Sequence, residues 1–397
     1  MQLLQQLRGL IIILLLHLWA QNTEYRKEKN MRKLISLLLA LMLVFSLVAC
    51  GTSGESETQT PTEGQTEAQT DNNTEAVTDP AGVSYPVTVT DMAGREVTIE
   101  SEPKSIVSGY YISSSACIAL GLEDKMVGIE AKADKRPIYA DAAPQLMELP
   151  NVGTAKEFDL ETCLSTEPDL VILPMKQKDT AAALEELGVP ALLVMPESHE
   201  QIIEMFTLIG TATNSMEAAQ ELIAYYEAEL AEVEALVAGV SDAPVVYITG
   251  TSSYLTTAPG QMYQSTLITA AGGNAAGADI EGSSWTEISY EQLLAMNPDI
   301  IVVPTNSFAN GAPDFTVEGL LADAQLSEVT AIKNGAVYQM TIGFEAWDSP
   351  APSGILGVKW MLKTIHPDLY SQEAFAADVQ EFYETFYGFS VDANELA

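Results

Sequence analysis

The sequence predicts an α/β protein of two similar Rossmann-like lobes, each built on a parallel sheet, with one long helix joining them. Three observations carry this prediction: a duplicated segment of 17 residues, a long helical pattern between its two copies, and an alternation of strands and helices on both sides of that pattern. Such a repeated order of strand and helix is typical of parallel sheets covered by helices.

The duplicated segment occupies residues 158–174 and recurs 130 positions later at residues 288–304. The copies read FDLETCLSTEPDLVILP and ISYEQLLAMNPDIIVVP. Each begins with a residue type that caps helices, Asp159 or Ser289, and each short helix ends before a proline. The apolar run after each proline lacks alternation, as in strands buried on both faces. Two lobes of like design with a ligand between them are the simplest interpretation.

The remaining elements follow in order. A hairpin is expected first, and then strands and helices alternate, so the strand ends of each lobe should form one edge where ligands bind. The expected strands are 87–90, 95–99, 105–108, 126–130, 170–173, 191–195, 245–248, 300–303 and 336–340, and the expected helices outside the duplicated segment are 113–120, 180–187, 265–271, 353–365 and 372–386.

The long helical pattern runs from residue 216 to 240 and contains no glycine or proline before Gly239. We interpret it as a rigid connection between the lobes, although a plain amphipathic surface helix gives the same pattern. The predicted domains are therefore an N-terminal lobe at 84–212, a linking helix at 213–242 and a C-terminal lobe at 243–397.

The N-terminal region predicts secretion and lipid anchoring. Residues 31–49 have a basic start, an apolar run and small residues before Cys50, as in a signal peptide of the lipoprotein type. Similarity to the bacterial lipobox implies cleavage before Cys50 and its acylation, which places the protein on the outer face of the cytoplasmic membrane. Residues 1–30 are interpreted as an upstream mis-start, and the acidic, Thr- and Glu-rich residues 50–83 as a disordered tether.

Composition excludes several classes of function. After Cys50 the chain has 12 Lys and Arg against 53 Asp and Glu, so nucleic acid is not an expected partner. Only His199 and His366 remain in that part, which is too few for a bare zinc or manganese site. Cys117 and Cys163 are either free core thiols or a disulfide pair, and the sequence leaves both open.

Several stretches in the same order carry a family likeness: VTDMAGREVTI, ALGLEDKMVGI, EPDLVILP, LEELGVPALLV, SSWTEISYEQLLAMNPDIIVV and KNGAVYQM. Through them the chain resembles the periplasmic-binding-protein-like lipoproteins of ABC importers for iron complexes, the group that binds ferric siderophores, haem, cobalamin and, in one branch, molybdate or tungstate. The resemblance implies a class III periplasmic-binding-protein-like fold, delivery to a permease and its ATPase, attachment to the membrane through the lipid anchor only, and a monomer.

Loops at the predicted strand ends hold six of the twelve cations that follow Cys50, all in the first lobe. Cations gathered around one cleft of an acidic protein indicate an anionic ligand, although long lysines also decorate ordinary surface loops. Aromatic residues lie in the same loops, where they either pack inward or face a ligand. The resemblance adds that Trp285 matches a pocket tryptophan of cobalamin-binding relatives, and that Trp347 lies in a late loop that contacts ligands. The candidate ligand-binding residues are Tyr110, Tyr111, Lys135, Arg136, Tyr139, Lys156, Lys176, Tyr254, Trp285 and Trp347.

The sequence favours a receptor that captures an anionic iron chelate, a ferric siderophore first, with molybdate or tungstate, haem or cobalamin as alternatives. No intrinsic cofactor, protein-bound metal or catalytic residue is expected. A secreted enzyme or a stalked adhesin or sensor is the alternative from another class, but we find no nucleophile elbow, P-loop, metal triad or dinucleotide turn. The family's docking glutamates fall at Ser115 and Gln261 by approximate matching, which is a departure from the family pattern.

Overall fold

The computed structural model describes residues 82–250, 252–304, 315–340 and 345–391. These residues belong to one compact unit, Val77–Ala397. The predictions for residues 1–30, for the signal segment 31–49, for the lipidation site Cys50 and for nearly all of the tether lie outside the described residues.

The N-terminal lobe opens with the predicted hairpin. Strand β1 (Val87–Thr90) pairs antiparallel with β2 (Glu96–Ile99). The turn between them is closed by Asp91, whose Oδ1 accepts the backbone N–H groups of Ala93 and Arg95 at 3.0 and 2.9 Å. Such a side-chain bond to the following backbone is what favours aspartate in turns.

The N-terminal sheet is wholly parallel, in the order β4-β3-β5-β6. Its strands are short and almost entirely buried, which explains their unbroken apolar sequences. They are β3 (Ile106–Ser108), β4 (Met126–Ile129), β5 (Leu170–Pro174) and β6 (Ala191–Val194). The helices of this lobe are α2 (Tyr111–Ala119), α3 (Pro137–Ala142), α4 (Leu160–Ser165), α5 (Lys178–Glu186) and α6 (His199–Thr213).

The C-terminal lobe repeats this design with a sheet in the order β12-β11-β7-β9, again all parallel. A small antiparallel pair, β8 (Thr256–Thr257) with β10 (Thr286–Glu287), is added to it. The sheet strands are β7 (Val245–Ile248), β9 (Asn274–Ala275), β11 (Ile300–Val303) and β12 (Val337–Gln339). The helices are α8 (Tyr263–Ala270), α9 (Tyr290–Met296), α10 (Val317–Leu321), α11 (Thr330–Asn334), α12 (Gly354–Ile365) and α13 (Gln372–Phe386).

Both sheets have the same topology when their strands are numbered from the start of each lobe. In each sheet the second strand pairs with one edge of the first strand. The third strand pairs with the other edge of the first, and the fourth strand pairs with the third. The order therefore reverses between β3 and β5 in one lobe, and between β7 and β11 in the other. Ligands of open parallel sheets bind beyond the carboxyl ends of the strands at such a point.

The duplicated segment accounts for this symmetry. Asp159 caps α4 by accepting the N–H of Thr162, and Ser289 caps α9 in a capping box with Gln292. Immediately before the proline of each copy, Glu167 and Asn297 both have positive φ values, of 51° and 41°. The predicted turn before each proline is thus confirmed, and both turns have a left-handed residue.

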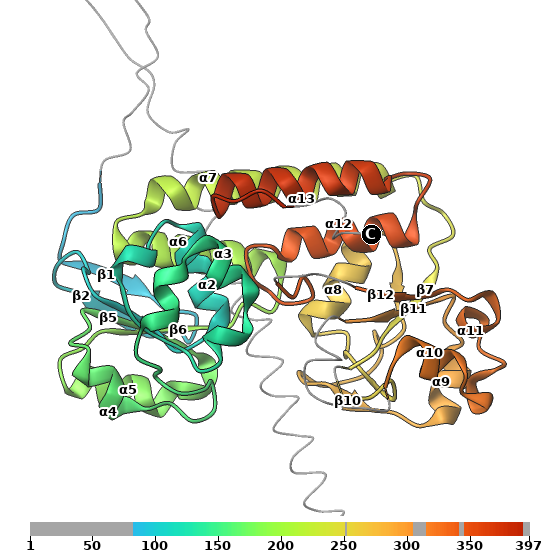
Figure 1. The fold of residues 1–397 in the computed structure, drawn as a ribbon, viewed down its shortest axis with the longest axis horizontal. Coiled ribbons are helices and arrows are strands. Elements are labelled where there is room, and N and C mark those ends of the chain that lie inside the picture. Colours follow the sequence, from blue (N-terminus) through green and yellow to red (C-terminus); the bar gives the residue numbers. More distant parts are fainter. Residues whose placement is uncertain (1–81, 251, 305–314, 341–344, 392–397) are drawn as a thin grey trace, which may run out of the picture. The chain divides into compact units, whose positions relative to one another are not determined.

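Helix α7 (Met216–Val237) joins the lobes and ends three residues before the predicted limit. It packs against α6 of the N-terminal lobe and against α8 and α12 of the C-terminal lobe. Its buried residues Ala219, Leu222, Tyr226 and Val233 lie at helical spacing, so one face supports both lobes. In Figure 1, α7 and α13 run along one side of the unit, opposite α5 and β10.

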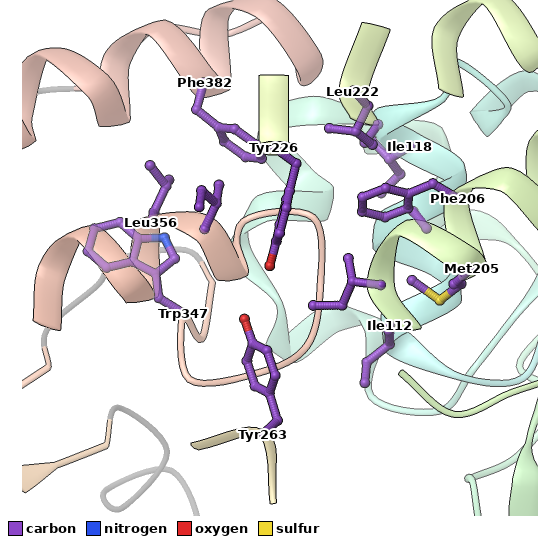
Figure 2. Packing of buried hydrophobic residues seen from close by; sticks show 14 of the residues in the cluster. Ile112, Ile118, Met205, Phe206, Leu222, Tyr226, Tyr263, Trp347, Leu356 and Phe382 are labelled. Atoms are coloured by element: carbon purple, nitrogen blue, oxygen red, sulfur yellow. The ribbon is translucent and has the colours of Figure 1, made fainter. Parts of the chain in front are cut away.

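One apolar core extends through both lobes. Figure 2 shows Ile112, Met205 and Phe206 on the N-terminal side, with Trp347 and Leu356 on the C-terminal side. Between them the hydroxyl groups of Tyr226 and Tyr263 point toward each other, and this interaction opposes the rise in the pKa of Tyr226 that burial causes. The two lobes therefore pack against each other around α7.

A buried lysine also fixes α7 to the C-terminal lobe. Lys359 of α12 has a side chain only 1% exposed and forms ion pairs with Glu229 and Glu232 of α7 and with Asp378 of α13. The ammonium group lies 2.8 Å from Glu232 Oε2. One cation thus neutralises part of the charge of three carboxylates from two other helices.

The sequence prediction omitted the helices α3, α6, α10 and α11 and the short strands β8, β9 and β10. Helix α6 does carry terminal signals, because Ser198 caps its first turn and Asn214 ends it with a φ of 58°. The lobe boundaries at 212 and 242 remain predictions.

Candidate ligand-binding cleft

All four strands of the N-terminal sheet are followed by a polar residue that can contact a ligand. Tyr110 and Tyr111 follow β3, Glu130 follows β4, Lys176 follows β5 and Glu197 follows β6. Parallel strands bring these positions to one edge of the sheet. The opposing lobe meets the same edge, since the hydroxyl of Tyr111 donates to Ser349 Oγ at 3.1 Å.

The two tyrosines are held by the start of α2. The carbonyl of Tyr110 accepts the hydroxyl groups of Ser108 and Ser113 at 3.1 and 2.8 Å. The rings of Tyr110 and Tyr111 meet edge to face with centroids 5.2 Å apart. Burial raises the pKa of both phenols, so they are neutral groups with fixed ring positions.

Arg136 lies over this pair. Its guanidinium carbon is 4.1 Å from the centroid of the Tyr111 ring, a cation–π contact, and its Nε lies 3.3 Å from Glu130 Oε1. The arginine side chain is 31% exposed, and no hydrogen bond of its terminal nitrogens is found among the described residues. Arg136 is therefore a positioned cation with donors still available.

Glu130 contacts both Arg136 and Tyr139 and is only 5% exposed. It accepts the hydroxyl of Ser114, and Tyr139 donates to its Oε1 at 2.8 Å. The Tyr139 hydroxyl also lies 3.2 Å from the Tyr111 carbonyl. Burial raises the pKa of Glu130, while Ser114, Arg136 and Tyr139 oppose that rise.

The two lobes enclose a cavity of about 20 Å³ between these groups. Tyr111, Ser115, Arg136 and Ile138 line it from the N-terminal lobe, and Glu345, Ala346, Ser349 and Ala351 from the C-terminal lobe. A cavity of this size holds about one water molecule. The bond between Tyr111 and Ser349 joins the two walls of this cavity.

The C-terminal wall carries two shielded carboxylates. Burial raises the pKa of Glu345, whose neighbours include the hydroxyl of Tyr383 at 3.2 Å and the charge of Arg136. Asp348 is 3% exposed, its Oδ1 has no hydrogen-bond partner in the part of the chain that the structure describes, and burial raises its pKa to about 6. The sequence analysis singled out neither residue, although Glu345 and Asp348 lie close to Trp347 in the sequence.

The structure brings together four of the predicted residues: Tyr110, Tyr111, Arg136 and Tyr139. Tyr139 differs from the expectation in one respect. Its side chain is fully buried and supports Glu130, so its ring is not on the cleft surface. Lys176 is exposed nearby, and its charge lowers the pKa of Glu197, which burial raises.

Two aromatic residues lie elsewhere than predicted. Trp347 is fully buried, donates its indole N–H to Tyr383 at 3.0 Å and packs edge to face on Phe375. Tyr254 is half-buried, packs against a second core within the C-terminal lobe and donates to Asp323 at 2.7 Å. Trp347 thus fills a core, where its indole N–H has a buried partner, whereas the hydroxyl of Tyr254 bonds to a partly exposed carboxylate.

The other predicted residues lie nearer the rim. Trp285 is half-buried in the loop before β10 and packs against the shared core. Lys135 is 74% exposed beside Asp134, and Lys156 is exposed on the loop before α4. Ser115, matched to a docking position, is 2% exposed with its carbonyl bonded to Tyr387, so that match was wrong.

The remaining polar groups of interest have structural partners. His199 Nδ1 lies 2.9 Å from the Tyr226 hydroxyl, and burial lowers the pKa of this histidine to about 4. His366 Nε2 contacts the carbonyl of Gly272. Cys117 and Cys163 are free and buried. Among the described residues, the one carboxylate group spaced for a metal ion is Glu229, Glu232 and Asp378, where Lys359 supplies the cation.

A family model described as periplasmic binding protein matches residues 106–341. The chain belongs to this family. The fold, with its two parallel sheets and single linking helix, is that of the class III members. In the part of the chain that the structure describes, no helix combines the length and apolar character needed to cross a bilayer.

Similar proteins of this family have names that indicate different ligands. The chain is 25% identical over 311 residues to the uncharacterized ABC transporter substrate-binding lipoprotein YvrC of Bacillus subtilis, covering 72% of this chain and 88% of the relative. It is 25% identical to the cobalamin-binding protein of Halobacterium salinarum (71% and 75% covered) and 23% identical to the molybdate-binding protein MolA of Haemophilus influenzae (78% and 93%). Among solved structures, a periplasmic solute binding protein of Veillonella parvula is 29% identical, with a TM-score of 0.67 over 78% of this chain and 95% of that one.

Proposed function

We propose that this protein is the substrate-binding lipoprotein of an ABC importer, and that it captures an anionic metal chelate, a ferric siderophore, between its lobes. Family membership supports the transport role, since the relatives carry names of binding proteins for metal complexes or oxyanions. The observation that carries the choice of an anion is Arg136, a partly exposed guanidinium at the cavity whose terminal nitrogens have no hydrogen-bond partner among the described residues.

The electrostatics of the cleft support an anion over a neutral ligand. A bidentate guanidinium matches the paired oxygens of carboxylate, catecholate or oxyanion groups. Lys176 adds a second cation on the next strand end. The partly exposed rings of Tyr110 and Trp285 offer apolar surface to a ligand larger than a simple oxyanion.

The size of the cavity favours a second candidate, a molybdate-type oxyanion. A space of about 20 Å³ is nearer to a small oxyanion than to a chelate, which needs the lobes to open first. Haem is less well supported, because burial raises the pKa of the Tyr110 phenol and so disfavours the phenolate that would bind iron. Cobalamin would make little use of Arg136 and Lys176.

The proposed location is the outer face of the cytoplasmic membrane, with Cys50 as the acylated residue. Palmitate labelling of the wild-type protein and of Cys50→Ser tests this assignment. Label in both proteins would contradict it.

A ligand-binding assay tests the proposed function. Purified protein is titrated with ferric enterobactin, ferric citrate, sodium molybdate, haemin and cyanocobalamin while thermal stability and calorimetric heat are recorded. We expect one ferric chelate to bind, and Arg136→Gln to weaken that binding about 10- to 100-fold, since hydrogen bonds to a charged group contribute about 1.5–3 kcal/mol. Lys104→Gln, an exposed cation at the opposite edge of the same sheet, is the control. Equal affinity in wild type and Arg136→Gln would overturn the assignment.

A further inference from the structure

Four exposed lysines lie on neighbouring loops at the carboxyl edge of the N-terminal sheet. They are Lys132, Lys156, Lys176 and Lys178, and we call them the N-lobe lysine patch. Lys132 follows β4, Lys156 precedes α4, and the other two flank Gln177 after β5.

Backbone and side-chain bonds show that these loops are adjacent. The N–H of Ala131, next to Lys132, bonds to the carbonyl of Gly153 at 2.6 Å. The carbonyl of Ala155, next to Lys156, accepts the side-chain amide of Gln177 at 3.1 Å. The lysines therefore share one surface.

Their lack of partners is unusual in a chain with a net charge of −37. Four of the six other lysines that the structure describes are paired with acids: Lys125 with Glu102, Lys135 with Asp134, Lys333 with Glu328, and Lys359 with three acids. Among the described residues, no carboxylate lies within ion-pair distance of the four patch lysines. Unpaired cations on an acidic protein indicate a surface that binds an acidic partner.

The C-terminal lobe presents the opposite charge. Its three lysines are Lys333 on α11 and Lys359 and Lys363 on α12, none of which lies in a loop after a sheet strand. The segment that follows β9 carries the exposed acids Asp279, Glu281 and Glu287. Because the bond between Tyr111 and Ser349 brings the two carboxyl edges together, the cleft has a basic rim on one lobe and an acidic rim on the other.

We propose that the N-lobe lysine patch docks the protein onto an acidic surface of the membrane permease, with the acidic rim of the C-terminal lobe facing a basic surface of the same permease. Any protein that receives the ligand from the cleft must cover its rim, so it must contact these loops. The inference rests on delivery to a permease, which is part of the proposed function, but not on the identity of the ligand.

The opposite charges of the two rims constrain the permease. A permease with twofold symmetry presents the same charge to both lobes. One lobe would then face a permease surface that carries the same charge as the lobe itself. Like charges across an interface are strongly unfavourable. The opposite charges of the two rims therefore fit a permease whose two halves differ in charge. A symmetric permease would accept the protein in two orientations related by the twofold axis, whereas this permease accepts only one of them.

Charge reversal tests the patch without touching the proposed ligand residues. The variant Lys132→Glu/Lys178→Glu is suitable because Lys178 is the first residue of α5, where a glutamate is favoured by the helix dipole. Binding to the permease–ATPase complex of the same host in nanodiscs is measured by biolayer interferometry. At about 0.05 M salt we expect at least tenfold weaker binding for the variant, and at about 1 M salt a ratio near one, because salt screens surface charges.

The control is Lys104→Glu on the opposite edge of the same sheet, which should bind the permease as the wild type does. The metal content of each protein purified from its host reports separately on ligand capture. Unchanged metal content with weakened docking supports the patch. A change in docking below about twofold at low salt, or an equal loss in Lys104→Glu, would overturn the inference even if ligand capture is intact.

A crosslinking experiment tests the polarity of the rim. A photoreactive residue is placed at position 178 or at position 281 in the native host, and the crosslinked peptides are sequenced. We expect both positions to label the permease, with acidic residues around the site reached from 178 and basic residues around the site reached from 281. Adducts to a second copy of this chain, or no permease adduct from 178, would contradict the proposal.

Discussion

The substitution Lys359→Met tests the energetic role of the buried ion cluster that joins α7, α12 and α13. It removes the ammonium group from a site that is 1% exposed and leaves Glu229, Glu232 and Asp378 without a cation. Removing one partner from a buried ion pair costs about 3–5 kcal/mol. The three carboxylates are 19%, 53% and 23% exposed and can be partly hydrated, so we expect about 3 kcal/mol, at the lower end of that range.

The assay is thermal unfolding followed by circular dichroism at several pH values. For a unit of this size, about 3 kcal/mol corresponds to a fall in Tm of about 6 °C at pH 8. Burial and the charge of Asp378 raise the pKa of Glu232, and in the variant no lysine opposes that rise. The loss of stability is therefore complete at high pH and decreases as pH falls toward the unfolded pKa near 4.

Two further variants sharpen this test. Lys363→Met, one turn further along α12, removes a cation whose side chain bonds to the neutral Gln372, and it should lower Tm by less than about 2 °C. Adding Glu229→Gln and Glu232→Gln to Lys359→Met should restore most of the stability, because it removes the uncompensated charge. If Lys359→Met melts within about 1 °C of the wild type at pH 8, the cluster does not stabilise the fold as argued.

Three further outcomes follow from the structure. Asp348→Asn should stabilise the protein at pH 8 by on the order of 2 kcal/mol, because the folded pKa of Asp348 is raised to about 6, and the gain should vanish near pH 4; a gain that does not depend on pH would show another cause. Tyr111→Phe removes the bond to Ser349 between the lobes, so small-angle scattering should show a larger radius of gyration for the ligand-free variant, whereas an unchanged radius would mean that other contacts keep the lobes together. Asp159→Ala and Ser289→Ala each remove a helix cap and should each cost about 1 kcal/mol in urea unfolding, and a much larger loss at one site would indicate that the two copies are not energetically equivalent.

The fold was predictable because its signals are local. The caps at Asp159 and Ser289, the proline after each short helix and the unbroken strand that follows specify one strand–helix unit twice, and the same sheet order results in both lobes. The limits of β7 and α13 match the prediction because each element begins at a local signal: Pro244 precedes β7, and Ser371 caps α13. Helix α6 is less evident from the sequence because its interior contains threonines and Gly210, although Ser198 and Asn214 cap its ends.

The cleft was only partly predictable because burial is a property of the packed structure. Sequence reasoning placed Tyr111 and Arg136 at strand ends, and they do meet. It could not show that Tyr139 and Trp347 find internal partners in Glu130 and Tyr383, which turn both rings inward. Nor could it single out Glu130 among 55 acidic residues, since only the packed sheet brings Ser114, Arg136 and Tyr139 around it.

The central claim is that the cleft holds an anionic metal chelate. The most direct measurement is the visible absorption spectrum together with metal analysis of the protein purified from its native host without added ligand. The account predicts a coloured, iron-containing protein that loses its iron in Arg136→Gln. Colourless wild-type protein without iron, or iron retained in full by Arg136→Gln, would contradict it.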